Sequence, residues 1–143
     1  MKVIIRIAFL VLAYSSVEAQ ELTVSVFGQS SELGFQRGYS IQYEKEKWGM
    51  GVLFQSGKTI SLETSNNNHP FIGLTIAREL YTAGKMRLLL TPKVGFVNQH
   101  FLVFIPELQT EFNLYKGLRL SLGTAIRARQ PAATLALSYQ ILK

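Results

Sequence analysis

The sequence predicts an all-β fold, an eight-stranded antiparallel up-and-down transmembrane β-barrel. After residue 20, apolar residues alternate almost continuously with polar or small ones, and turn residues separate the alternating segments. The face opposite the apolar one is rich in glycine, alanine and serine, and its acidic and basic residues are nearly balanced. Small residues and balanced charges are expected in the crowded interior of an eight-stranded barrel.

The first nineteen residues lie outside this pattern. Lys2 and Arg6 precede a short apolar run, and the Val17-Glu18-Ala19 motif has small residues at its first and third positions. Residues 1–19 are therefore expected to be a cleaved secretory signal peptide. The run is too short for a spanning helix, which needs roughly 20 apolar residues. The barrel domain is expected to comprise residues 20–143.

The composition excludes several classes of function. The chain has no cysteine and no aspartate, which excludes disulfide staples, aspartate-rich calcium loops and aspartate-based catalytic triads. It has only two histidines, so neither a metal site nor another cofactor is expected. The net charge of +6 comes from basic residues scattered singly, so no nucleic-acid partner is expected.

The first four predicted strands each show a distinct alternation. Residues 21–27 alternate leucine and valine with threonine and serine. Residues 39–45 alternate two tyrosines and an isoleucine with polar residues, and residues 48–55 set apolar side chains against two glycines, a leucine and a glutamine. Residues 72–81 set aliphatic side chains against glycine, threonine, alanine and glutamate, and Arg78 interrupts their apolar face.

The last four predicted strands continue the rule. They are residues 86–97, 106–115, 117–129 and 133–142. Pro92 lies within the first of them, and because proline has no backbone N–H, a bulge or a locally broken strand pair is expected there. Each segment is long enough to approach the roughly 9–11 residues of a tilted membrane strand.

The connections predict two different ends. Short polar turns follow the second, fourth and sixth strands, whereas longer segments, including 28–38, 56–69 and 98–105, connect strands at the other end. Short periplasmic turns and longer external loops are typical of outer-membrane barrels. The apolar stretch within His100 to Ile105 is unusual for an external loop. It is expected either to extend two strands as a protruding ribbon or to form a sticky edge for a protein partner.

Two closed architectures fit the alternation. A secreted lipocalin-like barrel that binds an apolar ligand would face its apolar side inward, whereas a membrane barrel would face it toward lipid. The glycines favour the membrane barrel, because glycine destabilises a strand and marks a crowded place. The other face would then form an interior ladder of Glu–Arg and Glu–Lys pairs, in which Lys93 or Arg87, Glu107 or Glu111, and Arg119 or Arg127 are expected to meet. Arginines of 117–129 are expected to pair with Glu107 and Glu111. The members of this predicted ladder are Glu44, Glu79, Arg87, Lys93, Glu107, Glu111, Arg119 and Arg127.

Aromatic side chains on the apolar face are expected near strand ends, where they would form girdles at the membrane interfaces. These residues are Tyr39, Tyr43, Trp48, Phe54, Phe112, Tyr115 and Tyr139.

The pattern resembles the small eight-stranded outer-membrane barrels of Gram-negative bacteria, of the OmpX type and the OmpA membrane domain. These proteins carry a C-terminal insertion signal, and Thr134, Ala136, Tyr139 and Ile141 have its spacing, with alanine in place of glycine. The resemblance implies location in the outer membrane, contact with its lipid, insertion by the outer-membrane assembly machinery, and a monomeric barrel.

Three kinds of function were weighed for such a barrel. Some barrels of this size are lipid-modifying enzymes, but neither His100 nor His69 lies in a matching histidine-x-serine motif, and a histidine–aspartate–serine set is impossible here. A porin-like channel is disfavoured, because the side chains of eight strands fill the interior. The expectation is a non-enzymatic structural or surface-interaction role.

Overall fold

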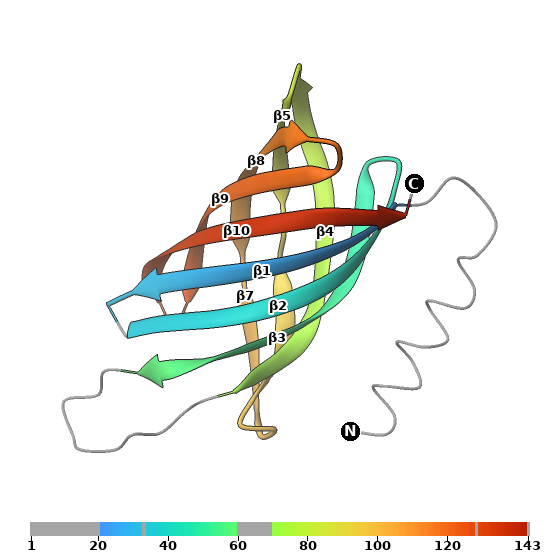
Figure 1. Ribbon diagram of the computed structural model, residues 1–143. Coiled ribbons are helices and arrows are strands. Elements are labelled where there is room, and N and C mark those ends of the chain that lie inside the picture. The colour runs from blue at the N-terminus through green and yellow to red at the C-terminus, as the bar shows by residue number, and fades with distance from the viewer. Residues whose placement is uncertain (1–20, 33, 60–69, 128, 143) are drawn as a thin grey trace.

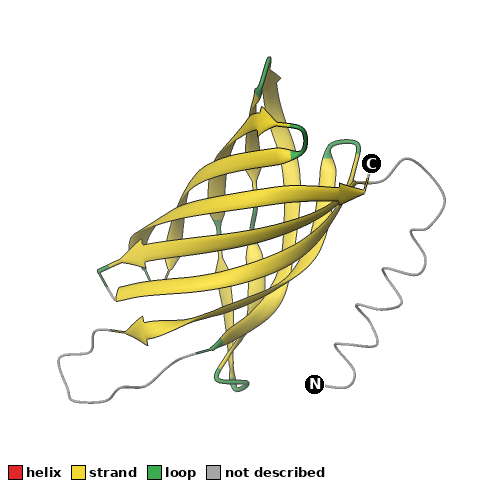
Figure 2. Cartoon of the chain, in the orientation of Figure 1, coloured by secondary structure: helices red, strands yellow, loops and turns green. Residues whose placement is uncertain are grey.

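The computed structural model describes residues 21–32, 34–59, 70–127 and 129–142 (Figure 1). All regular structure in these residues is β-strand (Figure 2), and no helix among them is long and apolar enough to cross a membrane. The strands are β1 (Glu21–Ser31), β2 (Gly34–Lys45), β3 (Trp48–Thr59), β4 (Phe71–Ala83), β5 (Met86–Leu90), β6 (Lys93–Val97), β7 (Phe101–Ile105), β8 (Glu107–Tyr115), β9 (Leu118–Arg127) and β10 (Gln130–Leu142).

These segments form the eight strands of an antiparallel barrel, because β5 continues into β6 and β7 continues into β8. Both interruptions occur at a proline, Pro92 and Pro106. The expected break at Pro92 is confirmed. Hydrogen bonds bridge it, since Thr91 N–H donates to Glu107 O (2.8 Å) and Ile76 N–H donates to Pro92 O (3.1 Å).

The barrel is closed, as the sequence predicts, because every strand has neighbours around the ring. β1 pairs with both β2 and β10, and the ring is completed through β3 and β4. A path along paired residues leaves β1 at Ser31 and returns to it at Glu21, ten residues earlier. A stagger of this size tilts all strands strongly against the barrel axis, as Figure 1 shows.

The expected long loops at one end are mostly wrong. Residues 28–31 and 34–38 belong to β1 and β2, and Ser31 pairs directly with Gly34 across a tight turn. Residues 101–105 form β7, so the connection there shrinks to the turn 98–100. The connection between β3 and β4 is longer, and its residues 60–69 lie outside the described part of the chain.

Two glycines of the segment 28–38 lie within strands rather than in a loop. A Cβ added to Gly38 would lie 2.6 Å from the ring of Phe27, and one added to Gly28 would lie 2.8 Å from the ring of Phe35. These glycines therefore make room for aromatic rings on neighbouring strands.

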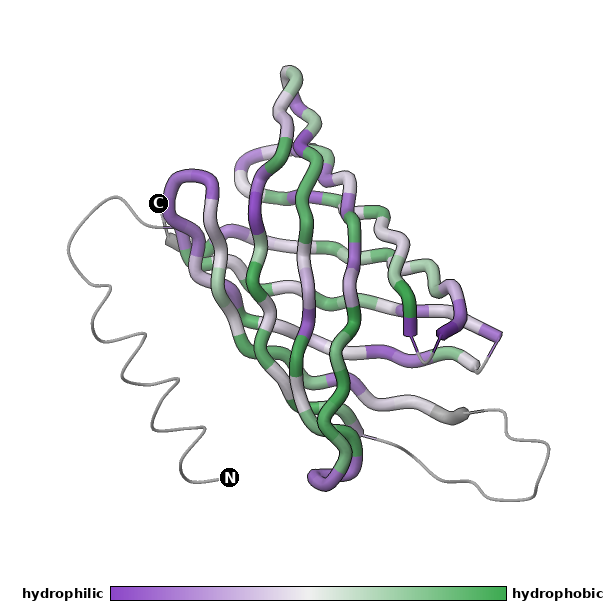
Figure 3. Tube along the Cα trace, turned by 180° about the vertical axis from the view of Figure 1, so that it is seen from behind, coloured by the Kyte–Doolittle hydropathy of each residue, from purple (hydrophilic) through white to green (hydrophobic). Residues whose placement is uncertain are grey.

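The outer surface is apolar, as expected for the membrane barrel. Leu122 and Leu135 are each about half exposed, at 52% and 53%, and large apolar residues on every side of the barrel share this exposure. Figure 3 shows the apolar positions recurring along the strands. The soluble lipocalin-like alternative is wrong, because it requires this face to point inward.

The interior differs from the expected filling of charged and small side chains. Large apolar residues also point inward and are buried: Phe27, Leu53, Phe71, Leu89 and Ile105. Two of them escaped the sequence analysis, because Phe71 preceded the predicted fourth strand and Ile105 lay in a predicted loop. The predicted crowding at glycines is confirmed at Gly123, where an added Cβ would lie 2.7 Å from Glu107 Oε1.

Candidate functional site

The interior charges gather mainly at one end of the barrel. We call this the termini end, because it holds Glu21 and Leu142, the first and last strand residues, together with the β2–β3, β4–β5 and β8–β9 turns. The opposite end, with the β1–β2, β6–β7 and β9–β10 turns, is the far end.

Arg87 is one of two arginines in the network at the termini end. It projects from β5, and its guanidinium contacts carboxylates from three other strands. Its Nη2 lies 2.5 Å from Glu111 Oε1 and 3.1 Å from Glu44 Oε2, and its Nη1 lies 3.8 Å from Glu79 Oε2. This arrangement brings together four residues of the predicted ladder.

Arg119 is the second arginine and joins the same carboxylates from β9. Its Nη1 lies 3.1 Å from Glu44 Oε2 and 3.7 Å from Glu111 Oε1, and its Nη2 lies 2.5 Å from Glu21 Oε2. Nη2 also donates to Gln140 Oε1 at 3.1 Å. The sequence analysis missed Glu21, although continuing the alternation of Thr23 and Ser25 by one step would have placed it inside.

A separate ion pair lies between the network and the far end. Lys93 Nζ contacts Glu107 Oε2, and both residues are at least 95% buried. Lys93 Nζ also lies 4.9 Å from the ring centroid of Phe27, and Gln109 Nε2 donates to Glu107 Oε1 at 2.6 Å. A buried charge is tolerated only when it is paired in this way.

The structure brings the predicted Lys93 to Glu107, whereas the predicted pairing of Glu107 with an arginine of 117–129 is not found among the described residues. Arg127 is half-buried at the end of β9 and makes no ion pair with a described residue. Lys93 of β6 pairs in register with Ile105, the last residue of β7. Glu107 follows two residues later, after the break at Pro106, so the two charged side chains lie close together.

Uncharged amide side chains occupy the interior toward the far end. Gln55 Nε2 donates to Gln29 Oε1 (2.9 Å), and Gln29 Nε2 donates to Thr134 Oγ1 (3.2 Å). All three residues are buried. The alternation of the predicted strands placed Gln55 and Thr134 on the inward face, which is confirmed, whereas Gln29 fell in a predicted loop.

The side chains nearly fill the barrel. A cavity of about 60 Å³ remains between the network and Lys93, lined by groups such as Thr23, Thr75 and Ser121. Such a space holds a few water molecules. Among the described residues no group of three acidic or histidine side chains is placed to hold a metal ion.

The predicted aromatic girdle is partly displaced. Tyr43, Trp48, Tyr115 and Tyr139 lie on the outer surface near the termini end, and the half-buried Phe112 is close to the same end of β8.

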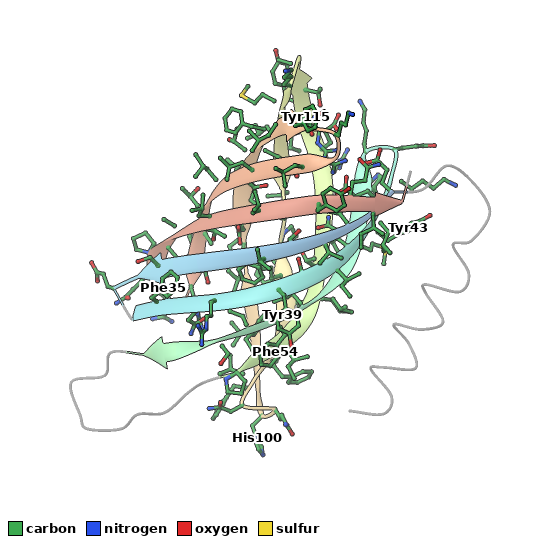
Figure 4. All side chains as sticks on the ribbon, viewed as in Figure 1. Phe35, Tyr39, Tyr43, Phe54, His100 and Tyr115 are labelled. Atoms are coloured by element: carbon green, nitrogen blue, oxygen red, sulfur yellow. The ribbon has the colours of Figure 1, made fainter. Side chains whose placement is uncertain are left out.

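Tyr39 and Phe54, however, stack on each other at 5.3 Å in the middle of β2 and β3 (Figure 4). Their expected position at strand ends is wrong, because both strands continue well beyond the predicted boundaries. The aromatic residues that the sequence analysis missed toward the far end are Phe35, Phe101 and Phe104.

The four residues of the predicted insertion signal lie on β10. Thr134 and Ala136 are buried in the interior, whereas Tyr139 and Ile141 are exposed on the outer surface. The predicted signal peptide, residues 1–19, and His69 lie outside the described residues.

The segment from His100 to Ile105 is a turn residue followed by β7. His100 is exposed in the β6–β7 turn, and its Nδ1 lies 2.5 Å from Asn98 O. Phe101, Leu102 and Phe104 are about two-thirds exposed, at 68%, 67% and 63%. Within the described chain, β7 pairs as a strand only with β6 and stands last in the strand order.

Comparisons with known proteins identify the fold. No protein-family model matches the chain, and no curated protein sequence matches it. Among solved structures, a de novo designed transmembrane β-barrel matches with a TM-score of 0.66 and 9% identity, covering 87% of this chain and 98% of the designed one. The N-terminal β-barrel domain of Pseudomonas aeruginosa OprF matches with a TM-score of 0.60 and 11% identity, covering 85% and 97%.

The outer-membrane protein Ail of Yersinia pestis, solved in a phospholipid bilayer nanodisc, matches with a TM-score of 0.55 and 11% identity, covering 86% of this chain and all of Ail. All three matches span nearly the whole barrel, and their low identities leave the fold as the shared property. The chain has the fold of the small eight-stranded outer-membrane β-barrels.

Proposed function

We propose that this chain is an exported, non-enzymatic outer-membrane protein, a monomeric barrel with a rim surface for a protein partner. The observation that carries the proposal is the distribution of polarity. Exposed apolar side chains surround a closed barrel, whereas its ion pairs lie inside. Lipid is the solvent that makes this distribution stable.

Detergent dependence tests the membrane role. The chain is refolded into detergent micelles, and its gel migration is compared before and after boiling. We expect a faster unheated band and β-rich circular dichroism that requires detergent or lipid. A folded, water-soluble monomer without detergent would contradict the proposal.

Each terminus carries a predicted signal, for export at the N-terminus and for membrane insertion at the C-terminus, and each can be tested. Cleavage after Ala19 would leave Gln20 as the first residue, which mass spectrometry of the mature protein measures. The exposed Tyr139 is proposed to act in the insertion signal, so Tyr139→Ser is expected to slow insertion by the assembly machinery. Tyr43→Ser, at another outward tyrosine near the same end, is the matched control.

The orientation can be tested because the chain contains no cysteine, so an introduced one is its single thiol. Glu32 and Lys85 are exposed in turns at the far end and the termini end, respectively. We expect an impermeant maleimide to label Glu32→Cys on intact cells and to label Lys85→Cys only after lysis. The reverse pattern would place the far end in the periplasm.

The rim surface consists of β7 with its exposed Phe101, Leu102 and Phe104. An edge strand can pair with an extended segment of another protein, and exposed apolar side chains beside that edge add contact area. A photoreactive group on Leu102→Cys is expected to crosslink a partner protein on cells. The same group on Leu122→Cys, in the middle of β9 on the outer surface, is expected to reach lipid only.

A further inference from the structure

An open groove of about 840 Å³ lies on the outer surface, where β10, β1, β2 and β3 run side by side (Figure 4). Aromatic rings of Phe35, Tyr39 and Phe54 line one part of it, and Leu135 and Leu137 line another. The volume is in the range of ligand sites, roughly 300–1,000 Å³. The groove is therefore large enough for a ligand, and it lies on the surface that is proposed to contact lipid.

The groove contains one cation, Arg37. The guanidinium is carried on the exposed face of β2, between the outward rings of Phe35 and Tyr39, and Arg37 pairs in register with Gly28 and Ser56 on the adjacent strands. Arg37 forms no ion pair or side-chain hydrogen bond with another described residue. It lies three residues after the start of β2 and eight before its end, and so within the half of the barrel toward the far end.

A second outward arginine, Arg78, has an aromatic partner. The guanidinium of Arg78 lies 4.9 Å from the ring centroid of Trp48, which stabilises its charge. Arg37 has no comparable partner within the described chain, although a lipid-facing charge is costly and requires a counter-ion or water. A ligand with a negative charge would supply this counter-ion.

We propose that this groove binds an anionic phosphate-bearing lipid, with the phosphate on Arg37 and an acyl chain along the apolar walls. A planar guanidinium donates two parallel hydrogen bonds to phosphate, which a lysine ammonium does not. The aromatic and leucine side chains contact the chain of the same lipid, so headgroup and tail are recognised together. The inference rests on the proposed membrane location and adds a lipid-selective site to it.

The test measures lipid retention by native mass spectrometry, with the barrel folded in a neutral detergent. The probes are dimyristoyl phosphatidic acid and dimyristoyl phosphatidylcholine, which differ only in the headgroup. We expect the wild-type barrel to retain phosphatidic acid about fivefold more than phosphatidylcholine, the effect of one basic residue on an anionic lipid. Arg37→Gln is expected to abolish this preference, and Arg37→Lys to keep part of it.

Arg78→Gln is the matched control, since it removes another outward arginine, and it is expected to keep the wild-type preference. The heat-dependent gel shift of each variant verifies folding separately, so a failure to form a membrane barrel is distinguished from a failure to select lipid. An unchanged preference in Arg37→Gln would overturn the site. Equal loss in Arg78→Gln would show general surface charge, and displacement by an equal concentration of inorganic phosphate would show a free-anion site instead.

Discussion

The two ends of the barrel interior are filled by different kinds of side chain. At the termini end, Arg87 and Arg119 each contact three carboxylates, four in total, and they share Glu44 and Glu111. Toward the far end, buried amides of Gln29 and Gln55 lie with apolar side chains such as Phe71. The same ring of strands encloses both.

The difference predicts which end of the interior is destabilised more when a single side-chain contact is lost. A buried ion network is stable only while every charge keeps a counter-charge, because desolvation is costly and the attraction repays it only in good geometry. An uncharged amide that loses its hydrogen-bond partner costs about 1–3 kcal/mol, which is less than the cost of a buried charge that loses its counter-charge. Substitutions at the termini end should therefore be more damaging.

The largest effect is expected for Arg119→Leu. It leaves Glu21 without an ion-pair partner among the described residues and leaves Glu44 and Glu111 with Arg87 alone, which should cost about 3–5 kcal/mol in the free energy of unfolding. Urea unfolding in lipid, followed by the fluorescence of Trp48, measures it. Arg119→Lys keeps the charge and should lose less. A loss below about 1 kcal/mol would mean that water enters and solvates this end.

Gly123→Ala tests the layer between the two ends. The added methyl group would lie 2.7 Å from Glu107 Oε1 and must displace the carboxylate that pairs with Lys93. Overpacking of this kind typically costs about 1–3 kcal/mol. The same unfolding experiment checks it, with Gly84→Ala as a control for a glycine in a turn whose Cβ would meet no atom within 4 Å. That control still carries the strain of a positive φ, so similar losses in both would argue against a crowded interior.

At the far end, Gln55→Leu should cost about 1–2 kcal/mol. It leaves the buried Gln29 Oε1 without its donor, but it also removes Gln55 Oε1, a buried acceptor without a hydrogen-bond partner in the described chain. Leucine then packs near Phe71. A loss as large as that of Arg119→Leu would show that the two ends do not differ.

The smallest effect is expected outside the barrel at the termini end. Arg78→Ala removes the contact with Trp48 and should change stability by about 0.5–1 kcal/mol, as other exposed cation–π pairs do. Here the emission wavelength of Trp48 is the more sensitive readout. A larger loss would indicate that this outer arginine supports the inner network.

Much of the fold could be predicted because alternation is a local property. Residues two apart point to the same side of a strand, so Arg119 and Glu111 were placed inside and Leu122 outside without knowledge of their neighbours. Strand ends were less predictable, because Gly28 and Gly38 give the same local signal in a loop and beneath an aromatic ring. The displaced positions of Tyr39 and Phe54 follow from this.

The sequence by itself determined that the chain forms a closed eight-stranded barrel, which face points outward and, apart from Glu21, which charges lie inside. Only the tertiary structure decided which charges meet. Pairing across the interior joins residues far apart in the chain, such as Glu21 with Arg119, and depends on the stagger of the closed ring. It also decided that Lys93, not Arg127, reaches Glu107, because the β6–β7 hairpin places Lys93 opposite Ile105, two residues before Glu107.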